Sequence, residues 1–167
     1  MIVVISDTHG DRTWKETIVR RHAPEHIWHC GDSELSPNDR IWDGVTVVCG
    51  NNDRRYERSA EGEWETIPWW IVHGHEHDVY TSLLRLSYGA EERGSRLVCF
   101  GHTHMRGAER IERTLFVNPG SYTRPRGSNE PTYATLERNG SSIHVTWYTP
   151  DGQRVTSVSF EKMIDNE

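Results

Sequence analysis

Residues that commonly bind metal ions gather in five short stretches of this sequence, each at the predicted end of a strand. They are two aspartates, one asparagine and four histidines: Asp7, His9, Asp32, Asn51, His73, His102 and His104. This mixture of oxygen and nitrogen ligands suits Mn, Fe, Ni or Zn better than Ca or Mg. One ion would leave ligands unused, whereas two ions that share a bridging carboxylate would use them all. The sequence therefore predicts a two-metal site, an arrangement that promotes in-line attack on phosphorus.

Runs of apolar residues precede most of these side chains and are typical of buried strands. The predicted strands are residues 2–5, 26–30, 45–49 and 97–100. A helix is expected over residues 11–22, and Ser36, Pro37 and Asp39 indicate the cap, first position and early acid of a short helix. This alternation of strands and helices predicts a mainly parallel sheet, whose loops converge at the carboxyl ends of the strands. We therefore expect the seven polar residues to be neighbours.

Glycines immediately precede three of the candidate ligands, Asp32, Asn51 and His102. A glycine lets the backbone turn sharply or approach a bound group closely. The pattern therefore predicts tight loops around the metal site.

The remaining elements are predicted from spacing and turn residues. Residues 54–62 form an exposed loop, residues 63–67 and 69–72 a hairpin with Pro68 at its turn, and residues 79–94 an amphipathic helix ending at Gly94. An antiparallel meander follows, over residues 114–118, 132–138, 142–148 and 153–160. We expect an α/β fold in which the two halves of the chain form two sheets, packed as a β-sandwich flanked by helices, with the metal site at the carboxyl ends of the strands.

Composition limits the class of protein. The 167 residues suit a single domain spanning residues 1–167, and the net charge of −6 opposes non-specific nucleic-acid binding. No apolar run is long enough to span a membrane and no secretory signal is evident, so we expect a cytoplasmic protein. The three cysteines match no disulfide framework or metal knuckle and are expected to be buried thiols. A homo-oligomer is left open.

Several other side chains have a structural interpretation. Trp64, Trp69 and Trp70 are expected between the sheets, and three arginines, Arg54, Arg55 and Arg58, are expected to form a solvated charge run. His77 either caps the following helix or lines the site.

The short stretches DTH (7–9), GD (31–32), GNND (50–53), HGH (73–75) and GHTH (101–104) resemble, in order and spacing, those of the calcineurin-like metallophosphoesterases. NPGS (118–121) followed by PR (125–126) is similar to a late motif of their small bacterial and archaeal phosphodiesterase branch. The resemblance covers residues 2 to about 126. It implies a binuclear metal-dependent phosphodiesterase that attacks a small phosphate ester with a metal-bridging hydroxide. Manganese is the first expectation for the ions, with nickel, iron or zinc as alternatives.

The resemblance also implies roles for single residues. Asp7, His9, Asp32 and His104 would bind the first ion, with Asp32 as the bridge. Asn51, His73 and His102 would complete the second site. Asp32 and Asn51 would thus act in catalysis as well as in binding.

The sequence departs from larger relatives at Asn52, where they carry a histidine that is taken to protonate the leaving group. An amide cannot donate that proton, and Asn52 is expected to contact the substrate instead. The small branch that this chain resembles also commonly lacks that histidine, so the departure weakens the case for a phosphomonoester more than the case for a phosphodiester. The leaving group then receives its proton from water or from His75, the second histidine of HGH. Arg126, in the PR motif, is a candidate phosphate contact, although a solvated loop also explains both Arg126 and Arg124.

Two other functions compete with this one. A non-catalytic scaffold similar to the retromer subunit has the same fold with an altered metal site, but the intact ligands count against it. A nuclease would need basic surface for nucleic acid, which this chain lacks.

Overall fold

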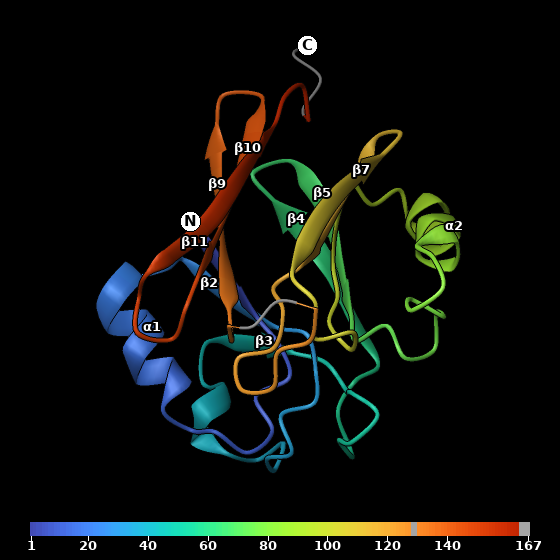
Figure 1. The fold of residues 1–167 in the computed structure, drawn as a ribbon. Coiled ribbons are helices and arrows are strands. Elements are labelled where there is room, and N and C mark those ends of the chain that lie inside the picture. The colour runs from blue at the N-terminus through green and yellow to red at the C-terminus, as the bar shows by residue number, and fades with distance from the viewer. Residues whose placement is uncertain (128–129, 164–167) are drawn as a thin grey trace.

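Two β-sheets pack face to face in the computed structural model, which describes residues 1–127 and 130–163 (Figure 1). The first sheet has the strand order β11-β10-β9-β1-β2-β3. Its strands are β1 (Ile2–Ile5), β2 (His26–His29), β3 (Val45–Val47), β9 (Tyr133–Asn139), β10 (Ser142–Tyr148) and β11 (Arg154–Phe160). The second sheet has the order β4-β5-β6-β8-β7. Its strands are β4 (Ser59–Trp64), β5 (Ile67–Val72), β6 (Leu97–Cys99), β7 (Gly107–Ile111) and β8 (Thr114–Asn118).

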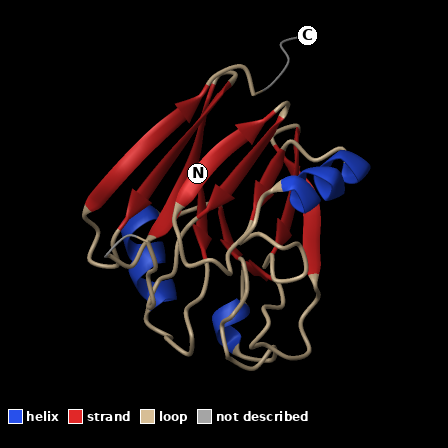
Figure 2. Cartoon of the chain, turned by 45° about the vertical axis from the view of Figure 1, so that its right-hand side comes forward, coloured by secondary structure: helices blue, strands red, loops and turns tan. Residues whose placement is uncertain are grey.

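Helices lie on the outer faces of this sandwich, α1 (Trp14–His22) against the first sheet and α2 (Leu84–Arg93) against the second (Figure 2). Successive side chains of a strand point to opposite faces. In β1, Ile2 and Val4 therefore enter the core between the sheets, whereas Val3 and Ile5 pack on the side of α1. The predicted sandwich flanked by helices is confirmed. Among the described residues, neither helix has the length and apolar character needed to cross a membrane.

The division of the chain between the sheets differs from the prediction. The two halves do not form separate sheets, because β9 pairs with β1 and so joins the C-terminal meander to the first sheet. The stretch over residues 114–118 is not part of that meander either, since β8 pairs with β6 and β7 in the second sheet. Local patterns predict strands but not their distant partners.

Two local predictions are also corrected. Pro68 does not form the hairpin turn, which lies at residues 65–66, but belongs to β5 opposite Glu63. The Pro68 carbonyl accepts a hydrogen bond from the Arg96 amide. The pairing of β5 with β6 begins at the next residue of each, Trp69 and Leu97. The short helix is a 3₁₀ turn, η1 (Arg40–Trp42), and Asp39 is its cap, with its carboxylate accepting from the Ile41 amide.

The tryptophans divide between two cores. Trp64 and Trp69 lie between the sheets as predicted, with the Trp69 ring 4.7 Å from that of Trp28. Trp70 points the opposite way, because it is the next residue of the strand. It packs under α2, where the Arg93 guanidinium lies 4.4 Å from its ring centre. The expectation for Trp70 was therefore wrong.

The cysteines are free thiols, with Cys30 and Cys99 buried and Cys49 half-buried. Burial raises the pKa of the Cys30 and Cys99 thiols well above the ordinary value, which keeps both protonated and unreactive. The prediction of buried thiols therefore holds for these two, and Cys49 is partly exposed.

Loops from the carboxyl ends of the parallel strands gather at one edge of the sandwich, at the lower end of Figures 1 and 2. Strands β1, β2 and β3 run parallel, as do β5, β6 and β8. Their ends bring together side chains from both sheets. Asp7 follows β1 and lies 3.8 Å from the Nε2 atom of His73, which follows β5.

Candidate metal centre

Asp7 lies at the middle of this edge and is completely buried. Its Oδ2 atom accepts from the Ser6 hydroxyl at 2.6 Å and from the His102 amide at 3.2 Å. Its Oδ1 atom has no hydrogen bond, although His104 Nε2 is only 3.1 Å away. Burial opposes ionisation, but His104 and His73 outweigh it and hold the pKa of Asp7 below its ordinary value. A buried carboxylate with an unused oxygen needs a positive partner.

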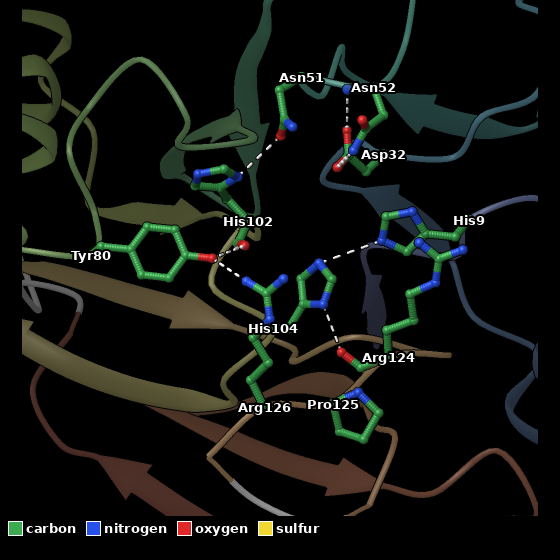
Figure 3. A pocket seen from close by; sticks show the side chains of 10 residues that line it. All are labelled: His9, Asp32, Asn51, Asn52, Tyr80, His102, His104, Arg124, Pro125 and Arg126. Carbon is green, nitrogen blue, oxygen red and sulfur yellow. Dashed lines mark hydrogen bonds between the residues drawn. The ribbon is translucent and has the colours of Figure 1, made fainter.

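His9 and His104 point toward the same position from different loops. The Nδ1 atom of His9 lies 2.7 Å from a Glu34 carboxylate oxygen, and that of His104 lies 2.6 Å from the Arg124 carbonyl. Each acceptor requires the proton on Nδ1, which leaves a lone pair on Nε2. The two Nε2 atoms face one another at 3.4 Å (Figure 3). A cation bound by these residues would satisfy both lone pairs and the unused oxygen of Asp7.

A second cluster consists of Asp7, Asp32 and His73. The Nδ1 atom of His73 donates to the Cys30 carbonyl at 2.7 Å. Its Nε2 atom lies 3.0 Å from Asn51 Oδ1 and 3.5 Å from Asp32 Oδ2. Although burial works in the other direction, Asp32 and Asp7 raise the pKa of His73 above its ordinary value. The oxygens around His73 therefore favour positive charge at this second position also.

Asn51 connects the second cluster to His102, because its Oδ1 atom also lies 3.1 Å from His102 Nδ1 (Figure 3). All seven predicted ligands are thus brought together at one edge. Asp7 belongs to both clusters of His and carboxylate side chains, whereas Asp32 belongs to one. Which carboxylate bridges two ions, and which ion each ligand holds, stay predictions.

Asn52 holds Asp32 in place. Its backbone amide donates to Asp32 Oδ1 at 2.8 Å, and its side-chain amide donates to Oδ2 at 2.7 Å (Figure 3). Burial raises the pKa of Asp32, but His73 and both Asn52 donors lower it more, so the carboxyl stays ionised. Both oxygens keep a free lone-pair direction for a cation.

Glycines allow these loops to approach one another as the sequence predicts. A Cβ atom on Gly50 would lie 2.0 Å from Asp32 Oδ1, and one on Gly101 would lie 2.0 Å from the Ser6 hydroxyl. No larger residue fits at either position. The loops around Asp32 and Asp7 therefore depend on both glycines.

The NPGS stretch supports the centre from the opposite sheet. The Ser121 hydroxyl donates to the Asp7 carbonyl at 2.8 Å, and the Thr123 hydroxyl donates to the same oxygen at 3.2 Å. The sequence predicts a turn here and shows a resemblance to a motif of the phosphodiesterase branch, but it does not predict these contacts. Neither this support nor the carbonyl of Arg124 could be found from sequence, because a turn signal does not say what the turn contacts.

A pocket of about 250 Å³ opens above the centre (Figure 3). It is lined by His9, Asp32, Asn51, Asn52, Tyr80, His102, His104, Arg124, Pro125 and Arg126. The Tyr80 hydroxyl donates to the His102 carbonyl at 3.1 Å and accepts from the Arg126 guanidinium. Tyr80 was missed because the sequence predicts a helix over residues 79–94, whereas α2 begins only at Leu84 and Tyr80 lies in the turn before it.

Two further histidines lie outside the lining of this pocket. His75 is exposed, with its ring 5.4 Å from that of His73. His77 neither caps α2 nor lines the pocket, because its ring packs edge-on against Trp70 at 5.4 Å. A role for His75 in proton transfer stays a prediction.

Comparison with known proteins identifies the same family from the sequence and from the fold. The calcineurin-like phosphoesterase superfamily domain matches residues 1–141. YsnB of Bacillus subtilis, named a probable metallophosphoesterase, is 34% identical over 161 residues, which cover 92% of this chain and 94% of that protein. A predicted phosphoesterase from Streptococcus pneumoniae superimposes with a TM-score of 0.90 at 33% identity, covering 95% of each chain.

A more distant structure shares the fold. Vacuolar protein sorting 29 from Cryptosporidium parvum superimposes with a TM-score of 0.80 at 15% identity, over 96% of this chain and 97% of that one. At that identity the likeness concerns the fold alone. The domain match and the closer relatives go further, and they show that this chain belongs to the calcineurin-like phosphoesterase superfamily.

Proposed function

We propose that this protein is a binuclear metal-dependent phosphodiesterase that acts on a small phosphate ester. The observation that carries the proposal is the pair of Nε2 atoms of His9 and His104, which face one another at 3.4 Å beside the unused Oδ1 atom of Asp7. The second cluster, around His73, supports a second ion. Manganese is our first choice for both ions, since imidazole and carboxylate ligands together suit a first-row transition metal.

Divalent ions held there would polarise the phosphoryl group and lower the pKa of a water molecule to near neutrality. The chain's own residues position the reaction. Asn52 fixes the orientation of Asp32, and Asn51 presents its amide oxygen between His73 and His102. Arg126, steadied by Tyr80, lines the pocket where it can donate to phosphoryl oxygens, as can Arg124.

The choice of a diester rests on the resemblance to the small phosphodiesterase branch, which commonly lacks a histidine at the position of Asn52. The amide of Asn52 is a hydrogen-bond donor but not an acid, and it is already committed to Asp32. His75 is close to His73 but does not line the pocket. A diester carries less negative charge than a monoester. Less positive charge is therefore needed at the metal centre to balance it.

The test combines metal analysis of the purified protein with hydrolysis of a panel of phosphomonoesters and phosphodiesters. We expect two divalent ions per chain and the highest kcat/KM for aryl diesters. Asp7→Asn should lose both the ions and the activity. Asp43→Asn, the same change at an exposed aspartate outside the pocket lining, should keep both. Metal binding without turnover of any ester would contradict the proposal and favour a non-catalytic scaffold of this fold.

A further inference from the structure

A second cavity, of about 570 Å³, adjoins the pocket above the metal centre. It is lined by Glu34, Leu35, Ser36, Pro37, Asn52, Asp53, Arg54 and Arg55. Asn52 lines both cavities, and its side chain donates to Asp32, which lines the first. A group attached to phosphorus at the metal centre can therefore extend past Asn52 into this second space.

The carboxylates in this lining are already engaged. Asp53 accepts from the amides of Glu34 and Gly50, at 2.7 and 2.9 Å. Glu34 accepts from His9 at 2.7 Å. By contrast, Arg54 and Arg55 make no hydrogen bond or ion pair with any residue that the structure describes. The lining thus holds two carboxylates and two guanidiniums and has no net charge, but only the guanidiniums keep all their donors for a ligand.

The loop that carries these arginines is fixed on both sides of them. Asp53 binds the loop before Arg54 through its two amide contacts. Tyr56 follows Arg55, and its hydroxyl donates to the Leu35 carbonyl at 2.7 Å. The two guanidiniums therefore extend from an anchored segment, which reduces the entropy lost when they bind an anion.

The cavity also has an apolar portion formed by Leu35 and Pro37. Leu35 packs against the buried cluster that contains Trp42. An apolar wall beside unpartnered guanidiniums matches a ligand with a flat organic part and an anionic end. The volume of this cavity is within the range that small organic ligands occupy in proteins.

We propose that this cavity is a subsite for a second phosphate, carried on a nucleoside-sized group of the substrate. This inference rests on the proposed phosphodiesterase function and narrows its substrate class to diesters with a nucleotide on the retained side. Arg54 and Arg55 are the specificity residues. The sequence predicts that they belong to a solvated charge run with Arg58, and all three are exposed as predicted. Arg54 and Arg55 differ from Arg58 in that Arg58 forms an ion pair with Glu76.

The test uses two chromogenic diesters that differ by one phosphate, thymidine 5′-(p-nitrophenyl phosphate) and its 3′-phosphorylated form. For the manganese-loaded protein we expect kcat/KM to be about tenfold higher for the 3′-phosphorylated ester, which corresponds to about 1.4 kcal/mol. The ratio should fall to about 1 in the Arg54→Ala/Arg55→Ala double variant and stay at the native value in Arg58→Ala. The Arg54→Lys/Arg55→Lys double variant should keep part of the preference that the double alanine variant loses. Lysine keeps the positive charge of arginine but not its fork of donors.

A native ratio near 1, or a preference that survives in the double alanine variant, would overturn the subsite. If neither ester is hydrolysed, the ester panel described above decides the phosphodiesterase proposal, and calorimetry decides the subsite. The native protein should then bind thymidine 3′,5′-bisphosphate about tenfold more tightly than thymidine 5′-phosphate, and the double alanine variant should bind both equally. Equal binding by the native protein would overturn the inference independently of catalysis.

Discussion

The Nδ1 atoms of His9, His73 and His104 each face a fixed oxygen acceptor, so each ring presents its Nε2 atom to the region of Asp7. Such partners fix the tautomer and orientation of a ligating histidine before a metal arrives. The arrangement is therefore preorganised, and little reorganisation accompanies metal binding. Single ligand changes should act mainly through lost metal contacts.

Asp32 is the predicted bridge between two ions, and its loss should therefore affect both. In Asp32→Asn we expect loss of both metals, or an activity loss on the order of 10³-fold or more. Elemental analysis and the rate with an aryl diester measure these effects. Two bound metals with a near-native rate would show that another carboxylate, such as Asp7, is the bridge.

The lack of an acidic group at Asn52 leads to a second prediction. Without general-acid assistance, which contributes about 10² to 10⁴-fold in rate, the leaving oxygen must depart as an anion. Aryl diesters should therefore react much faster than alkyl diesters.

The measurement is the dependence of rate on leaving-group pKa in the native protein and in His75→Ala. A shallow dependence that becomes steep in the variant would assign the proton to His75. If it is shallow in both proteins, the interpretation of Asn52 is wrong.

The candidate metal ligands could be found from sequence because metal chemistry restricts such residues to a few types, which here follow strands. Their supports could not be found in this way. Ser121 and Arg124 act through a hydroxyl and a carbonyl whose targets lie far away in the chain. Glu34, which orients His9, is in sequence an ordinary surface acid.

At the scale of elements, strong local signals were reliable. The apolar runs over residues 2–5 and 26–29 form β1 and β2, and Gly94 ends α2 in the left-handed region. The charged segment GAERI forms β7, which was missed because it shows no apolar alternation. Helix α1 begins at Trp14 rather than at residue 11, because Asp11 accepts from the Thr13 amide in a local turn.

Gly89 provides a prediction at this scale. It lies within α2, where alanine would ordinarily stabilise a helix by roughly 0.5 to 1 kcal/mol. Here a Cβ atom would lie 2.8 Å from Cη2 of the buried Trp70 ring. We expect Gly89→Ala to lower the free energy of unfolding by about 1 to 3 kcal/mol, since the crowding outweighs the gain in helix propensity.

Urea denaturation of this variant measures the effect. Glu92→Ala, at an exposed position of the same helix, is the control and should change stability by less than about 0.5 kcal/mol. A stabilised Gly89→Ala protein would mean that α2 can move away from Trp70.

At the scale of the whole molecule, the centre joins the two sheets, since Asp7 follows β1 and His73 follows β5. Metal binding should therefore stabilise the entire fold. At a free metal concentration 100 times Kd the gain is about 2.7 kcal/mol, which corresponds to a rise in Tm of roughly 5 to 10 °C.

Thermal denaturation with manganese and with a chelator tests this expectation. Asp7→Asn should remove the metal-dependent rise, and Asp43→Asn should keep it. A native Tm that is the same with manganese and with chelator would contradict a metal centre at this edge.

The pairing of β1 with β9 determines when this molecule can assemble during synthesis. Residues 2–5 are synthesised well before the strand that covers one of their edges, which spans residues 133–139. At about 5 to 20 residues per second, that edge of the nascent chain stays unpaired for roughly 6 to 26 s. Ser121 and Thr123, which hold the Asp7 carbonyl, arrive nearly as late. A ribosome-bound chain released before β9 therefore has the metal-binding residues in its sequence but not the sheet that gathers them.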